Sequence, residues 1–139
     1  MGGAASLLAT PPLEVDALIL ESVYPTIEEA ISDRITMRLG AFGTILTPLL
    51  TYQLKPRLGV GPEELRPIEK ARESHTPKFF IFGSEDRHTR IAESKRLFAD
   101  AADPKEAWAI EGAGHIDLHE FSTVEYERRV LYFLERYLR

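Results

Sequence analysis

Residues 78–86 read Lys-Phe-Phe-Ile-Phe-Gly-Ser-Glu-Asp, an apolar run that stops at a glycine and is followed at once by acidic residues. An unbroken apolar run of this length is typical of a strand buried on both faces, as in a parallel sheet. A second run, residues 108–115, reads Trp-Ala-Ile-Glu-Gly-Ala-Gly-His and ends in a histidine. Because ligands meet a parallel sheet at the carboxyl ends of its strands, we expect Asp86 and His115 to face each other there.

Between and around these runs, apolar segments alternate with segments of helical periodicity, which predicts βαβ units and a parallel sheet. Thr26 is a suitable N-cap for one helix, and Pro48 interrupts an apolar segment that we expect to form two short helices or one kinked helix. The expected strands are residues 15–20, 78–82 and 105–111, and the expected helices are 4–9, 26–39, 41–58, 63–72, 91–102 and 116–139.

The last of these helices carries apolar residues at steps of three and four, which predicts one stripe facing a core. The stripe comprises Val124, Val130, Leu131, Phe133, Leu134 and Leu138. We therefore predict an α/β fold in which a three-stranded parallel sheet is flanked by helices. Residues 1–139 would form a single domain with a helical, cap-like segment at about 25–72.

The composition of the 139 residues is that of an ordinary globular protein, with 44% hydrophobic and 28% charged residues. A net charge of −5 argues against nucleic acid as the main partner. No apolar stretch reaches the length of a membrane span, so no membrane association is expected. The chain has no cysteine, which excludes disulfides and thiolate metal sites and fits a cytoplasmic protein.

An acid and a histidine on neighbouring strand ends have a simple chemistry. A neutral imidazole takes a proton from a serine hydroxyl when a buried carboxylate holds its other nitrogen. Asp86 and His115 are therefore the candidate catalytic residues, with His115 as the base and acid and Asp86 orienting it.

The order strand–acid, then strand–histidine resembles the C-terminal half of an α/β-hydrolase of the esterase and dienelactone-hydrolase-like kind. In that family the nucleophile stands in Gly-x-Ser-x-Gly-Gly-Ala, and residues 1–5, Met-Gly-Gly-Ala-Ala, match the part that follows the serine. The resemblance implies ester or acyl hydrolysis of a small-molecule ester-like substrate without a cofactor. It also implies that the serine lies just upstream of Met1, that Met1 supplies an oxyanion N–H group, and that the first half of the sheet is absent. We expect the chain alone to be close to inert.

Other interpretations of the same residues stay open. Ser22 and Ser84 are alternative nucleophiles, although neither stands in a strand–turn–helix elbow. The pair is vestigial if the chain is a non-catalytic α/β module that binds a partner. A metal site at His115 and His119 is a third possibility, but the spacing lacks the His-Glu-x-x-His pattern, so no metal is expected. His88 either lines the same cleft or is exposed, and we expect exposure; His75 is expected to lie in a surface loop.

Half of a hydrolase sheet leaves the edge of its first strand bare, and such an edge is a template for pairing with another chain. We therefore expect a homo-oligomer, formed through residues 15–20 or through the cap-like segment. Residues 41–58 either line an acyl or alkyl pocket or belong to an ordinary core.

Overall fold

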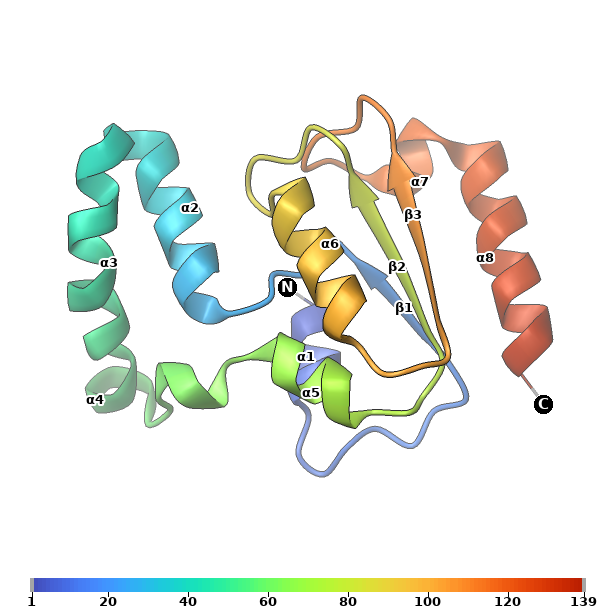
Figure 1. Cartoon of the computed structure of the whole chain (residues 1–139), viewed down its shortest axis with the longest axis horizontal. Coiled ribbons are helices and arrows are strands. Elements are labelled where there is room, and N and C mark those ends of the chain that lie inside the picture. The colour runs from blue at the N-terminus through green and yellow to red at the C-terminus, as the bar shows by residue number, and fades with distance from the viewer. Residues whose placement is uncertain (1, 139) are drawn as a thin grey trace.

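A computed structural model describes residues 2–138 as three parallel strands between two layers of helices (Figure 1). The strands are β1 (Leu18–Glu21), β2 (Lys78–Gly83) and β3 (Lys105–Ile110), in the spatial order β1-β2-β3. Lys78 of β2 is in register with Leu18 on one side and with Lys105 on the other. The predicted α/β class and the three-stranded parallel sheet are confirmed.

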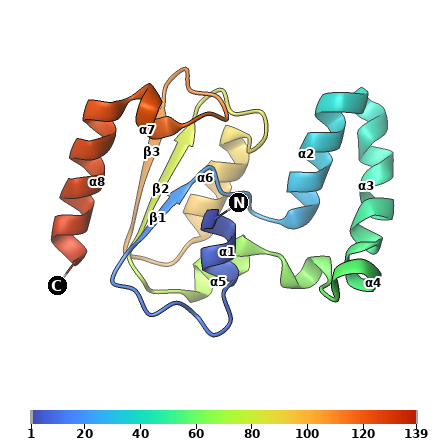
Figure 2. The ribbon, with the colours of Figure 1, turned by 180° about the vertical axis from the view of Figure 1, so that it is seen from behind.

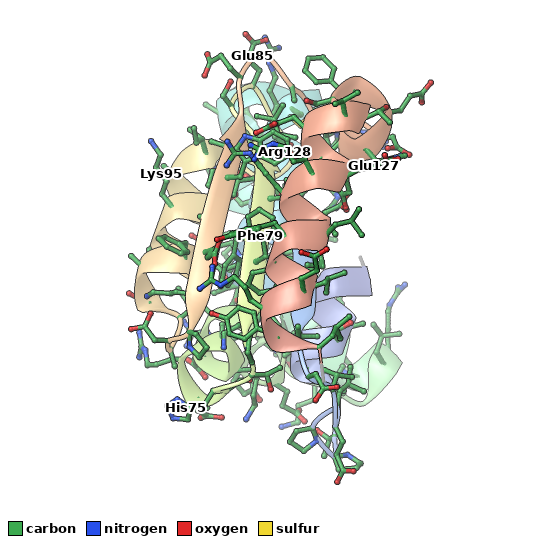
Figure 3. The ribbon with its side chains drawn as sticks, turned by 90° about the vertical axis from the view of Figure 1, so that its right-hand side faces the viewer. His75, Phe79, Glu85, Lys95, Glu127 and Arg128 are labelled. Carbon is green, nitrogen blue, oxygen red and sulfur yellow. The ribbon has the colours of Figure 1, made fainter. Side chains whose placement is uncertain are left out.

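The central strand, β2, is buried along its whole length because it faces a helical layer on each side. Phe80 and Phe82 enter one core cluster with residues of α1 (Gly2–Leu8), α5 (Pro67–Glu73) and α6 (Ile91–Asp100). Phe79 and Ile81 enter the other, with α7 (Leu118–Phe121) and α8 (Thr123–Tyr137). Figure 3 shows Phe79 beneath α8, and its ring centroid lies 5.3 Å from that of the fully buried Phe133. The uninterrupted apolar run thus places β2 in the middle of the sheet.

Three helices stand to one side of the sheet, at the end opposite α8 (Figures 1 and 2). They are α2 (Ile27–Leu39), α3 (Gly43–Tyr52) and α4 (Leu54–Leu58), with the short 3₁₀ helix η1 (Gly40–Phe42) between the first two. We call residues 27–58 the arm. Thr26 caps α2 by accepting a hydrogen bond from the backbone N–H of Glu29 (3.3 Å), as predicted. A second 3₁₀ helix, η2 (Pro62–Glu64), leads from the arm to α5.

The close packing of α2 on α3 depends on Gly43. A Cβ atom there would lie 2.7 Å from the backbone nitrogen of Thr36, a distance that real Cβ atoms do not reach. The sequence 41–58 forms η1, α3 and α4 and contains Pro48 within α3, so the prediction of short helices in this segment is confirmed.

The first strand is shorter than predicted. It begins at Leu18, not at Val15, and Val15 is 44% exposed. The ladder with β2 starts at the pair Leu18–Lys78, so residues 15–17 have no strand partner although Val15 and Ala17 are apolar. The apolar character of a segment is therefore not enough to predict the residue at which β1 begins.

The C-terminal helix also differs from the prediction. It is divided into α7 and α8 at Ser122, whose φ of −142° is not helical. Of its predicted core stripe, Phe133 is buried and Val130 and Leu134 pack against the same cluster. The prediction is wrong for Val124, Leu131 and Leu138, which are exposed. Within residues 2–138, no helix is long and apolar enough to cross a membrane.

Candidate functional site

Asp86 and His115 meet at the carboxyl end of the sheet. Nδ1 of His115 lies 2.9 Å from Oδ2 of Asp86, although the two residues are 29 positions apart in the sequence. Asp86 is buried, with only 4% of its surface exposed, whereas the side chain of His115 is 42% exposed. The predicted juxtaposition is therefore present, with a sheltered carboxylate behind an accessible imidazole.

The second oxygen of Asp86 is held by its own loop. Oδ1 accepts hydrogen bonds from the backbone N–H groups of His88 (2.8 Å) and Thr89 (3.0 Å). A short acidic side chain that bonds backbone groups two and three residues ahead is a standard way to close a turn. Both carboxylate oxygens are thus occupied, which fixes the orientation that Asp86 offers to the imidazole.

The loop that carries the acid is bonded to the loop that carries the histidine. The backbone N–H groups of Ser84 and Glu85 donate to the carbonyl oxygens of Ile110 (3.0 Å) and Ala113 (2.9 Å), and the N–H of Gly112 donates to Oγ of Ser84 (2.9 Å). Figure 3 shows Glu85 at the top of the molecule, beyond the strand ends. These bonds hold the two loops in one arrangement.

Gly83 makes this contact possible. A Cβ atom at Gly83 would lie 2.2 Å from the carbonyl oxygen of Ala113 and 2.9 Å from that of Gly114. The glycine that ends the apolar run is therefore the place where the histidine loop approaches β2. This gives a physical reason for the Gly that follows Phe82.

A hollow of 330 Å³ lies beside His115. It is bounded by the start of α1, the end of β1 and the residues that carry the imidazole: Gly2, Gly3, Ile19, Glu21, Ser22, His115 and Ile116. A Cβ atom at Gly3 would come within 2.6 Å of Cγ2 of Val23, so the glycine lets α1 begin close against the end of β1. The imidazole therefore lines a hollow next to the start of α1 and the end of β1.

The two alternative serines differ in their surroundings. Ser84 uses its hydroxyl to accept the bond from Gly112, which ties it to the loop framework. Ser22 lines the hollow, and its φ of +44° is rare for a residue with a side chain. No hydrogen bond joins Ser22 to His115 within residues 2–138.

His88 lies beside His115, which agrees with the alternative that it lines the cleft and not with the expected exposure. It is half-buried, and its ring centroid lies 4.7 Å from that of His115. It also lines a cavity of 600 Å³ between α2 and α3, together with Arg34, Ile35, Met37, Arg38, Leu39, Leu46 and Leu50. Its place two residues after the acid was the sequence signal that could have identified it.

The remaining histidines lie apart from the pair. His75 is at the opposite end of the sheet from Glu85 (Figure 3). Nε2 of His119 lies 3.0 Å from Oε1 of Glu127, so its ring is engaged on α8 and not with His115. No group of three or more potential metal ligands occurs in the part of the chain that the structure describes. The oxyanion role predicted for Met1 concerns a residue outside that part.

No protein-family model and no curated protein matches this sequence. Solved structures do match. An esterase of Pyrococcus furiosus is 14% identical with a TM-score of 0.65, over 98% of this chain and 49% of the esterase. The esterase domain of a Rhodothermus marinus protein is 16% identical with a TM-score of 0.67, over 99% and 59%. An acylaminoacyl peptidase of Pyrococcus horikoshii is 19% identical with a TM-score of 0.64, over 99% and 22%.

The chain thus spans about half the length of the esterases that it resembles, and nearly all of it is used in the match. At these identities the likeness concerns the fold. Its three parallel strands and its helical layers match part of such proteins. The protein therefore has the fold of the C-terminal half of an α/β hydrolase.

Proposed function

We propose that Asp86 and His115 are two members of a serine-hydrolase triad that cleaves esters or related acyl compounds. The observation that carries this proposal is the 2.9 Å contact between the imidazole and a buried carboxylate at the carboxyl end of a parallel sheet. The solved structures most like this chain include proteins described as esterases, which supports the same class of reaction.

In this mechanism the Nδ1–H group of His115 donates a hydrogen bond to Asp86, which leaves Nε2 free to act as a base. Nε2 takes the proton from the serine hydroxyl as the hydroxyl attacks the acyl carbon, and then delivers it to the leaving group. Asp86 stabilises the imidazolium that exists between these steps. Because backbone N–H groups hold its other oxygen, the carboxylate keeps its orientation throughout.

We place the nucleophile just upstream of Met1. The hollow beside His115 favours this placement, because it lies next to the start of α1 and the end of β1. The resemblance of residues 2–5 to the segment after a nucleophilic serine supports the same position. Residues 25–72 would then form a cap, with the 600 Å³ cavity beside His88 receiving the acyl or alkyl part of the substrate.

Labelling with a fluorophosphonate probe tests the proposal. The 139-residue chain should not be labelled, whereas a chain extended by the codons that precede residue 1 should be labelled at a serine in that extension. His115→Ala should abolish labelling of the extended chain. Asp86→Asn should slow its turnover by up to about 10⁴-fold, because the carboxylate no longer fixes the tautomer.

Two results would contradict the placement of the nucleophile. One is a stop codon in the reading frame before residue 1, with no serine codon between that stop codon and residue 1. The other is labelling of the 139-residue chain that disappears in Ser22→Ala, which would put the nucleophile at the end of β1. Ser84→Ala is the matched control, because Ser84 is bonded to Gly112 and is expected to have no part in labelling.

A further inference from the structure

One side of α3, together with the last residue of η1, carries a row of large apolar side chains that are mostly exposed to solvent. Phe42, Ile45, Leu49 and Tyr52 are 75%, 73%, 58% and 78% exposed. We call these four residues the α3 stripe. On the helix they lie away from the buried residues Gly43 and Thr51, and α3 forms the outer rim of the arm (Figure 1).

The spacing and chemistry of the α3 stripe are those of a helix contact. Steps of three, four and three residues repeat the pattern of a coiled-coil seam. The segment 43–52, Gly-Thr-Ile-Leu-Thr-Pro-Leu-Leu-Thr-Tyr, contains no charged residue, although a solvent-facing helix surface normally carries several. Single exposed apolar residues need no explanation, but a contiguous row marks an interaction surface.

We propose that the α3 stripe binds the α3 stripe of a second copy of this chain, with the two helices antiparallel. A twofold axis beside the midpoint of the stripe pairs Ile45 with the partner subunit's Leu49, and Phe42 with the partner subunit's Tyr52. The stripe is therefore self-complementary, with two aliphatic pairs at the centre and an aromatic pair at each end. A twofold interface requires this property.

The available area is sufficient for a specific contact. Four large side chains of ~200 Å² each, exposed by about seven-tenths, offer roughly 500 Å² per copy. The pair would bury about 1,000 Å² from the stripe alone, which is the lower limit for a biological interface.

The arm is better placed for this contact than the edge of β1. It projects from the sheet, so two arms can meet while the bodies stay apart (Figures 1 and 2). The edge of β1 borders the hollow beside His115, which the proposed nucleophile segment would fill. A net charge of −5 disfavours an anionic lipid surface as the occupant. The dimer does not depend on the proposed catalytic function.

Sedimentation velocity between 1 and 100 μM tests the proposal. The unmodified chain should form a dimer. Ile45→Glu and Leu49→Glu should each raise the dissociation constant by at least about 100-fold, because each places two charges in the seam of one dimer. Val124→Glu, which alters an 83% exposed apolar residue on α8, is the matched control and should dimerise normally. Far-UV circular dichroism confirms that each variant is folded.

Cysteine cross-linking tests the antiparallel register, since the chain has no cysteine of its own. A mixture of Ile45→Cys and Leu49→Cys chains should form a disulfide-linked heterodimer, and neither variant alone should cross-link efficiently. Cross-linking of Ile45→Cys alone would contradict the antiparallel arrangement. A monomer at 100 μM, or a dimer unaffected by Ile45→Glu, would overturn the proposal, as would a monomer that binds neutral phosphatidylcholine vesicles through Ile45.

Discussion

Replacing Glu93 with glutamine is expected to stabilise this protein at pH 8 and to leave its stability almost unchanged at pH 5. Glu93 begins α6 and is 8% exposed. Its Oε1 lies 3.3 Å from Nε of Arg90, which also pairs with Asp33 of α2. The second oxygens of Glu93 and Asp33, Oε2 and Oδ2, are buried without hydrogen-bond partners. One guanidinium therefore serves two buried carboxylates.

The pKa of Glu93 is raised from 4.5 to about 7, mainly by burial. The negative charge of Asp33 and its hydrogen bond to Glu93 also raise this pKa, as does the charge of Glu29, whereas Arg90 lowers it. The native state thus binds a proton that the unfolded state releases between pH 4.5 and pH 7. The associated stability is fully present below about pH 4.5 and is lost as the pH rises through 7. A shift of this size corresponds to about 3 kcal/mol at most. A glutamine at position 93 does not titrate, which stabilises the protein at pH 8, but it also lacks the ion pair with Arg90, which offsets part of that effect. We therefore expect the unfolding free energy at pH 8 to rise by about 1–3 kcal/mol.

Urea unfolding at pH 5, 6, 7 and 8 measures this effect, with the fluorescence of Trp108, the single tryptophan, as the signal. The difference in unfolding free energy between Glu93→Gln and the unmodified protein should grow steadily from pH 5 to pH 8. Glu125→Gln is the control, because Glu125 is exposed to solvent and the arginines beside it lower its pKa to about 2. A difference that stays constant over the whole range would refute the reasoning, since it would mean that Glu93 titrates equally in both states.

Two further changes test the packing behind the site. Gly83→Ala should destabilise the protein by about 1–3 kcal/mol and displace the histidine loop, because its Cβ overlaps the carbonyl of Ala113. The NMR signal of the His115 Nδ1 proton would report the displacement. Gly114→Ala is the control and should change neither the stability nor the position of the loop, because the nearest atom to its Cβ is 4.0 Å away. Phe133→Ala should cost about 3–5 kcal/mol in thermal or urea unfolding, because the ring is fully buried. The exposed Leu131→Ala should cost less than about 0.5 kcal/mol, and equal losses at the two positions would contradict the observed orientation of α8.

The sequence was sufficient to predict those features that depend on a local pattern. The apolar run of β2 was enough to predict that this strand is buried. The glycine at its end was enough to predict that Asp86 follows the strand end. The order of strands along the chain then brought Asp86 to His115, since neighbouring parallel strands end at the same edge. These inferences needed no knowledge of side-chain packing.

Features that depend on a neighbour from elsewhere in the chain were not predictable in this way. Val15 is as apolar as Leu18, but only Leu18 finds a partner on β2. Val124 and Leu131 recur at helical spacing but are exposed, because the face of α8 that packs on the sheet is the one that carries Phe133. The meeting of Asp33 with Glu93 likewise requires the placement of α2 against α6, which no pattern within either helix reveals.

The bonds between the loops after β2 and β3 have a consequence for assembly. The hydrogen bonds that hold Asp86, His115 and their loops together lie within residues 83–115, and one further bond runs from the Thr89 hydroxyl to the carbonyl oxygen of Ser22. The contact between the imidazole and the carboxylate is therefore formed by neighbouring segments of this chain. Under the proposed function, a separate polypeptide that brought a serine to the edge of β1 would meet an imidazole that is already oriented.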